Sequence, residues 1–138
     1  MTQIFITHKK VRDDKRIKIT SQLFGHHFPF HLEPAIYTFA RCLCSQYDGA
    51  YWNFYLLSNG GFYMAPSTND SFHVCCENGY EDELTADAFG IVVCLYAYSH
   101  LSFNTQKVFA KKCVKHYHFL RDFMLVNVEA SKIIAAID

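Results

Sequence analysis

The sequence predicts an α+β fold: a small antiparallel sheet of about three to four strands, packed with about four helices around a buried helix at residues 86–103. The first observation is the apolar run 87–103, in which no charged residue lies between Asp87 and His100. Such a run needs other elements around it or a bilayer, and it is shorter than the ~20 residues that a membrane helix requires. The second is Asn59-Gly60 between two aromatic runs, a strong hairpin signal. The third is a pair of segments with the apolar spacing of amphipathic helices.

The composition limits the possible classes of protein. The 138 residues fit one domain, 1–138, with residues 1–15 as a loosely held basic arm. A hydrophobic content of 51% excludes general disorder. Thirteen Lys and Arg balance thirteen Asp and Glu, which excludes both a DNA mimic covered in carboxylates and a strongly basic nucleic-acid binder. Six cysteines without a secretory signal indicate a cytoplasmic protein with reduced thiols.

The charges are distributed unevenly along the chain. Between Cys42 and Gln106 there are seven acidic residues and no Lys or Arg, so the remaining chain holds thirteen basic and six acidic residues. The two parts therefore carry opposite net charges of −7 and +7. Either they neutralise each other across the fold, or an acidic face centred on residues 77–87 is exposed to a basic partner surface.

The first third of the chain is expected to contain one clear helix. Residues 1–22 are polar and basic and are expected to end in a short strand or turn near residues 17–23. Residues 24–31 are interpreted as an aromatic loop, because Pro29 disfavours a helix there. Pro34 suits a first helical turn. The apolar face of that helix comprises Ile36, Tyr37, Phe39, Ala40, Leu43, Cys44 and Tyr47, and Asp48-Gly49 ends it.

The rest of the chain is expected to contain the strands and three helices. Residues 51–57 and 62–65 form the hairpin and residues 71–76 a third strand, and their short links imply antiparallel pairing. Gly90, inside the buried helix, is interpreted as a close approach to a neighbouring element. Asn104 or Thr105 caps the next helix, and a short last helix runs from 128 or 129 to 137. The apolar stripe of the long helix comprises Phe109, Cys113, His116, Tyr117, Leu120, Phe123 and Met124.

The residue types of three kinds of site occur in the sequence, but their arrangement disfavours each of them. Zinc could be held by a set of thiols and an imidazole, but Cys-x-Cys on a helix and adjacent cysteines on a strand point their sulfurs in different directions. The set comprises Cys42, Cys44, His73, Cys75 and Cys76. A Cys/His hydrolase needs a nucleophile motif, and His100 near Cys94 is interpreted as a hydrogen-bonded core histidine instead. The aromatic hairpin lacks the cations of a base-stacking platform and is interpreted as core. We therefore expect no catalytic residue, metal or cofactor.

One stretch carries a family resemblance. Residues 52–66, and above all Leu-Ser-Asn-Gly-Gly-Phe-Tyr-Met-Ala-Pro, resemble the signature of the ArdB/KlcA antirestriction family. Residues 86–91, 99–103 and 118–122 match in the same order, so that the resemblance spans roughly residues 16–138. It implies a small, non-catalytic protein of mixed fold, carried by plasmids or other mobile DNA. Such a protein inhibits the host's type I restriction-modification endonuclease without DNA mimicry, metal or cofactor.

The resemblance names an expected partner but no established functional residue. The partner is the host type I restriction-modification complex, contacted directly or indirectly, with weak or no nucleic-acid binding. We expect the contact surface to comprise Glu77, Glu81, Asp82 and Glu83. Asp138 adds negative charge at a helix C-terminus, where it opposes the helix dipole at a cost of ~0.3–1 kcal/mol. Either Lys132 or Arg121 compensates this charge, or Asp138 contacts a partner. The alternative is a small non-catalytic binding or regulatory module that contacts nucleic acid through the basic arm, Lys9 to Lys18.

Overall fold

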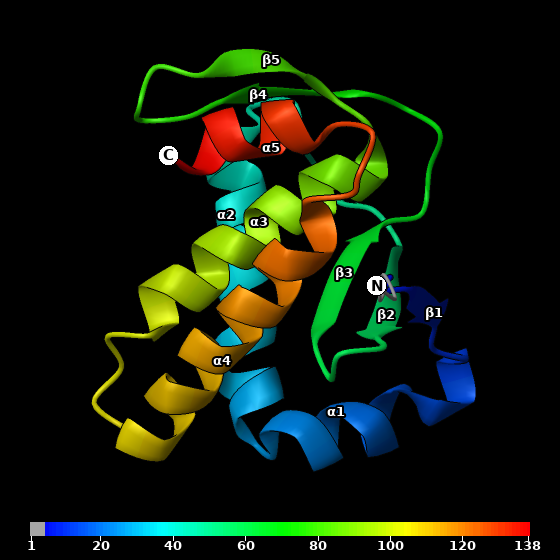
Figure 1. Cartoon of the computed structure of the whole chain (residues 1–138), viewed down its shortest axis with the longest axis vertical. Coiled ribbons are helices and arrows are strands. Elements are labelled where there is room, and N and C mark those ends of the chain that lie inside the picture. Colours follow the sequence, from blue (N-terminus) through cyan, green and yellow to red (C-terminus); the bar gives the residue numbers. More distant parts are fainter. Residues whose placement is uncertain (1–4) are drawn as a thin grey trace, which may run out of the picture.

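The computed structural model describes residues 5–138, and helix α3 (Ala86–Leu101) runs through its centre (Figure 1). Twelve of the sixteen residues of α3 are buried, which confirms the predicted buried helix. The helix packs against strand β3 and helices α2, α4 and α5, as its apolar surface on every side requires. Thr85 caps its start, because the Thr85 side chain accepts a hydrogen bond from the Ala88 N–H. None of the helices within residues 5–138 combines the length and hydropathy that crossing a bilayer requires.

A three-stranded antiparallel sheet lies beside α3, in the order β1 (His8–Lys10), β2 (Trp52–Leu57) and β3 (Phe62–Pro66). The predicted hairpin is confirmed: β2 pairs with β3 across a turn in which Gly60 has a φ of 99°. All five residues of β3 are buried, so the aromatic hairpin belongs to the core as expected.

Residues 8–10 differ from the expected loosely held arm. They form β1, the edge strand, in which His8 lies opposite Leu57. Thr7 and Ser58 exchange two hydrogen bonds, from the Thr7 N–H to Ser58 Oγ (2.9 Å) and from the Ser58 N–H to the Thr7 carbonyl (2.8 Å). A strand of three exposed residues leaves no apolar alternation in the sequence, so its pairing partner could not be inferred locally. Residues 1–4 of the arm lie outside the described part.

The segment before α2 is helical, where a strand or turn and then a loop were expected. A 3₁₀ turn, η1 (Asp13–Lys15), leads into α1 (Arg16–Phe24), and a π-helical turn, η2 (Phe28–Leu32), leads into α2 (Glu33–Leu43). The prediction for residues 24–31 was wrong because Pro29 occupies the first turn of η2, where its missing N–H is not needed. The amphipathic helix itself is confirmed, although it ends at Leu43, before the predicted Asp48-Gly49.

The third predicted strand exists but belongs to a separate sheet. β4 (Phe72–Cys75) pairs with β5 (Glu81–Leu84), and the two-stranded ribbon lies across one end of the molecule, at the opposite end from α1 (Figure 1). β5 was not predicted, since Glu-Asp-Glu-Leu is charged and lacks the β-branched or aromatic residues of typical strands.

Two further helices complete the fold. α4 (Lys107–Met124) packs along α3, and α5 (Ala130–Ile137) packs against α3 and β5. The apolar stripe of α4 is confirmed, including His116, which is 4% exposed. The assignment of His100 as a core histidine was wrong: it lies in the last turn of α3, where that helix emerges from the core, and it is exposed.

Candidate partner-binding surface

The β4–β5 ribbon has one apolar and one polar face. On the inner face Val74 and Leu84 are buried, and Phe72 stacks on Phe89 of α3 with ring centroids 4.5 Å apart. Side chains alternate along a strand, so the residues between these point away from the core. The register places Cys75 opposite Glu81 and His73 opposite Glu83. The outer face therefore presents His73, Cys75, Glu81 and Glu83, all of which are exposed.

The turn of the ribbon is fixed to the C-terminal helix. Asn78 donates from Nδ2 to the carbonyl oxygens of Ala135 (3.0 Å) and Ala136 (3.3 Å), and Gly79 has a φ of 92°. These carbonyls lie in the last turn of α5, where an intrahelical partner is missing. The anchor brings the turn that holds Glu77 beside the chain end that holds Asp138.

We call residues 72–84 the acidic ribbon, since all four predicted contact residues lie on it. Two of their carboxylates are paired: Glu81 with His73 Nε2 at 2.7 Å, and Asp82 with Lys132 Nζ at 3.8 Å. The hydrogen bond from His73 lowers the pKa of Glu81. Lys132 also donates to the carbonyl oxygen of Glu83 at 3.0 Å. Within residues 5–138, the carboxylates of Glu77 and Glu83 take part in no ion pair.

Asp138 is compensated as one of the two alternatives predicted. Its Oδ1 lies 4.0 Å from the Arg121 guanidinium, whereas Lys132 is used by the ribbon. Both partners are partly exposed, so the pair contributes no more than about 1 kcal/mol to stability. The weak pair leaves the Asp138 carboxylate accessible.

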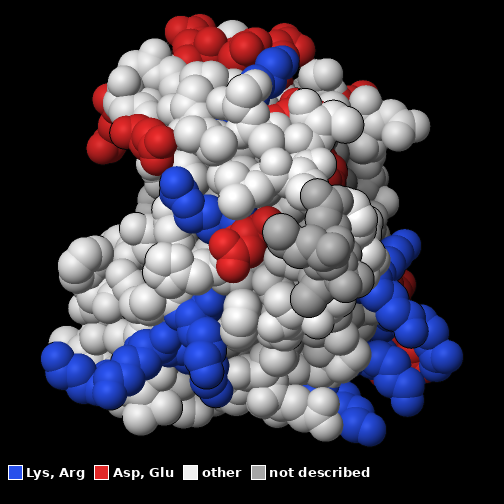
Figure 2. All heavy atoms as spheres, viewed as in Figure 1, with Lys and Arg blue, Asp and Glu red and all other residues white. Residues whose placement is uncertain are grey.

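The charges are segregated in space as they are in sequence. Acidic side chains gather over the acidic ribbon, whereas Lys and Arg lie mainly over the opposite half (Figure 2). Of the ion pairs within residues 5–138, only Lys132–Asp82 joins the acidic middle segment to the rest of the chain. The arrangement therefore favours an exposed acidic face over mutual neutralisation across the fold.

Four of the cysteine thiols have a raised pKa. Burial raises the pKa of the Cys94 and Cys113 thiols to about 12, and desolvation also raises the pKa of Cys76. The pKa of Cys75 is raised by desolvation and by the neighbouring Glu81 carboxylate. A reactive cysteine requires a lowered pKa, so the thiols with a resolved shift are unsuited to nucleophilic catalysis.

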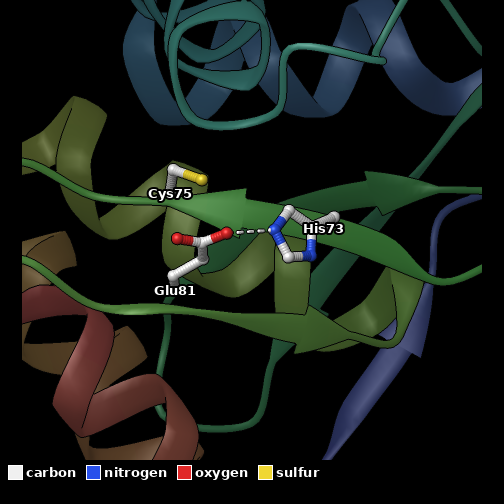
Figure 3. Close-up of side chains that lie close together, drawn as sticks. All are labelled: His73, Cys75 and Glu81. Atoms are coloured by element: carbon white, nitrogen blue, oxygen red, sulfur yellow. Dashed lines mark hydrogen bonds and ion pairs between the residues drawn. The ribbon is translucent and has the colours of Figure 1, made fainter.

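Potential metal donors do meet on the acidic ribbon, in a combination that the sequence did not indicate. His73, Cys75 and Glu81 each bring one ligand atom within 4.8 Å of the others (Figure 3). The sequence predicts Glu81 only as a partner-binding acid, because its position opposite Cys75 depends on the strand register. The adjacent Cys75 and Cys76 differ as expected for a strand, since Cys75 is exposed and Cys76 is buried. Cys42 is exposed and Cys44 is buried, but Cys44 follows the end of α2 at Leu43 and does not lie on a helix as expected.

Comparison with known proteins identifies the family. A family model described as antirestriction protein matches residues 45–138. The chain is also 37% identical over 135 residues to the antirestriction protein KlcA of Escherichia coli, covering 96% of this chain and 95% of that relative. The chain belongs to the antirestriction protein family.

Two further comparisons agree with this assignment. The uncharacterized protein YfjX of Escherichia coli strain K12 is 39% identical over 134 residues, covering 94% of this chain and 86% of YfjX. A solved structure matches with a TM-score of 0.91 and 37% identity over the full length of both chains. Its description states that KlcA and ArdB show a novel fold and antirestriction activity against type I DNA restriction systems in vivo but not in vitro. The predicted resemblance and the α+β fold are confirmed.

The stretch that resembles the antirestriction family signature holds the core together. The Tyr98 hydroxyl donates to the Phe62 carbonyl (2.7 Å), and Cys94 Sγ accepts from the Met64 N–H (3.4 Å). The Tyr63 hydroxyl donates to Asp87 at 2.6 Å. These contacts join β3 to α3, so this stretch contributes to the packing of the core.

Proposed function

We propose that this protein protects incoming mobile DNA by inhibiting the host type I restriction endonuclease through a protein contact made by the acidic ribbon. The observation that carries this proposal is the gathering of exposed carboxylates on a ribbon anchored at one end of the fold. An acidic face of this kind complements a basic protein surface. The balanced charge and the basic opposite half are unlike the uniform negative surface of a DNA mimic.

The contact involves a cellular component in addition to the endonuclease. This part of the proposal draws on KlcA and ArdB, which are described as active in vivo but not in vitro. A partner or condition lost on purification accounts for that difference. The place of action is the cytoplasm, where thiols remain reduced. The contact blocks cleavage and leaves methylation possible, so that protected DNA becomes modified.

The experiment is the plating efficiency of an unmodified phage on a type I restricting host, with and without the protein. The test variant carries Glu77→Lys, Glu81→Lys, Asp82→Lys and Glu83→Lys. We expect it to lose protection and to keep its thermal melting curve, because exposed ion pairs contribute only about 0–1 kcal/mol. Phage that survive on the restricting host with the unaltered protein should then form plaques at full efficiency on the same host without the protein. This result would show that their DNA had been methylated.

A matched control separates the ribbon from the total charge. Reversing Asp13, Asp14, Asp48 and Asp70 changes the net charge equally, and these four exposed residues lie outside the acidic ribbon. We expect this control to protect as well as the parent protein. Full protection by the ribbon variant, or equal loss in both variants, would refute the proposed contact.

Asp138 extends the proposed surface. Asn78 anchors the ribbon turn on the last turn of α5, so the chain end at Asp138 follows directly after the anchored carbonyls and brings a further negative charge to this end of the molecule. Removing Asp138 should reduce protection without changing the melting curve. Arg121→Ala breaks the same ion pair but keeps the carboxylate, and should therefore protect normally.

A second candidate function is contact with nucleic acid through the basic half. Lys9, Lys10 and Lys18 are exposed, and Figure 2 shows Lys and Arg side chains along this half of the molecule. Replacing these three lysines by Gln should abolish any DNA binding and its dependence on salt. DNA binding that is independent of salt would contradict this alternative.

A further inference from the structure

The outer face of the acidic ribbon brings together three side chains of different chemistry. His73 Nε2 and Glu81 Oε2 lie 2.7 Å apart, and one donor atom from each of His73, Cys75 and Glu81 lies within 4.8 Å of the other two (Figure 3). All three side chains are exposed. In the part of the chain that the structure describes, this is the one cluster of three or more His, Cys, Asp or Glu side chains with such spacing.

The cluster follows from the strand pairing. His73 and Cys75 are two residues apart on β4, so their side chains point to the same face. The antiparallel register places Glu81 directly opposite Cys75, and Glu83 directly opposite His73. Opposed residues in such a pair have Cβ atoms ~4.5–5.5 Å apart, which suits donors converging on one ion. The backbone of the ribbon thus sets the spacing before any ion binds.

We propose that His73, Cys75 and Glu81 form a binding site for Zn²⁺, in which Glu83 or a water molecule supplies the fourth ligand. Imidazole nitrogen, thiolate sulfur and carboxylate oxygen are the three protein ligand types that Zn²⁺ takes in tetrahedral sites. At zinc–ligand distances of ~2.0–2.3 Å, tetrahedral neighbours lie roughly 3.5 Å apart. The His73–Glu81 separation of 2.7 Å is shorter than that value and all three donors lie within 4.8 Å of one another. Because all three side chains are exposed, they have room to adjust around an ion.

Zinc binding changes the local chemistry in a defined way. His73 must present Nε2 without its proton and Cys75 must bind as a thiolate, so binding displaces protons to solvent. The ion links β4 to β5, and a two-stranded ribbon gains from such a link because an isolated hairpin is only marginally stable. An exposed site of three protein ligands also allows the ion to exchange.

The experiment is titration of the purified, reduced protein with Zn²⁺ by calorimetry, and with Co²⁺ by absorption spectroscopy. We expect one ion per chain and a near-ultraviolet sulfur-to-cobalt charge-transfer band, which only a thiolate ligand produces. Cys75→Ser should abolish that band. His73→Ala and Glu81→Gln should each weaken binding by about tenfold or more. Zn²⁺ should raise the melting temperature of the parent protein but not that of Cys75→Ser.

Matched controls use the same residue types elsewhere in the chain. Cys42→Ser removes the other exposed thiol, and Glu77→Gln removes a carboxylate from the same ribbon outside the cluster. His31→Ala removes a histidine outside the cluster, whose Nδ1 lies 3.1 Å from His27 Nδ1. All three controls should bind as the parent does. Absence of the cobalt band, binding that survives Cys75→Ser, or binding lost in His31→Ala would each overturn the proposal.

The site shares Glu81 with the proposed antirestriction contact, but the two properties can be tested separately. Cys75→Ser leaves every carboxylate of the acidic ribbon in place, so it removes zinc without removing the negative surface. Loss of zinc binding with normal phage protection would show that the two properties are separate. The metal titration decides the zinc site whether or not the ribbon contacts a restriction complex.

Discussion

Gly90→Ala tests the packing of α3 on β3, which positions the rest of the fold. A Cβ atom at residue 90 would lie 2.4 Å from Ala65 Cβ and 2.5 Å from both Ala65 Cα and the Met64 carbonyl oxygen. Carbon atoms in contact are normally ~3.5–4.0 Å apart, so the helix and strand would have to separate by about 1 Å. The predicted close approach at Gly90 is thereby confirmed.

The expected magnitude follows from two opposing terms. Overpacking of a core costs about 1–3 kcal/mol, and a collision with backbone belongs near the upper value. Ala is favoured over Gly inside a helix by about 1 kcal/mol. The net loss in the free energy of unfolding is therefore about 2 kcal/mol. At roughly 4 °C per kcal/mol for a chain of this size, the melting temperature should fall by about 8 °C.

Urea and thermal unfolding, followed by circular dichroism, provide the assay. Ser99→Ala on the exposed surface of the same helix is the matched control and should change stability by no more than about 0.5 kcal/mol. If Gly90→Ala were as stable as the parent protein or more stable, the gain in helix propensity would equal or exceed the cost of overpacking. The close packing of α3 on β3 would then be refuted.

Three further predictions concern single side chains. Burial lowers the pKa of His116 to about 4, so unfolding takes up a proton below pH 6.5. Stability should therefore fall by about 2 kcal/mol between pH 6.5 and 5, and urea titrations of His116→Phe should lack this loss. Tyr63→Phe removes the hydroxyl that contacts both Asp87 and His8 Nδ1 at 2.6 Å, and it should cost about 1–3 kcal/mol in urea unfolding. Tyr55→Phe, whose hydroxyl accepts one long bond of 3.4 Å, should cost less. Asn78→Ala frees the ribbon turn from α5 and should speed hydrogen exchange in residues 76–80 while α3 stays protected; equal exchange in both proteins would contradict the anchor.

Local patterns were sufficient for the elements that carry their own signal. The apolar run of α3 predicted its burial, because a helix without a polar face has no stable exposed orientation. The turn residues between β2 and β3 predicted the hairpin, because the turn requires a positive φ at residue 60 that is favourable for Gly and unfavourable for other residues. The stripe of α4 predicted that His116 faces inward. In each case the information lies within a few residues.

Pairing between distant segments required the tertiary structure. β1 consists of three exposed residues, and its pairing with β2, which lies 45 to 49 positions further along the chain, makes it a strand. Glu81 joins His73 and Cys75 solely because β5 pairs with β4 in this register. A shift of one residue would turn Glu81 to the opposite face and disperse the cluster.

The sequence by itself determined the α+β class, the buried central helix, the aromatic hairpin and the concentration of acids in the middle of the chain. Only the tertiary structure decided where those acids lie, which of them are paired, and which side chains stand beside them. The reason is physical: periodicity and turn chemistry act over a few residues, whereas the position of a charge on the surface depends on how whole elements pack.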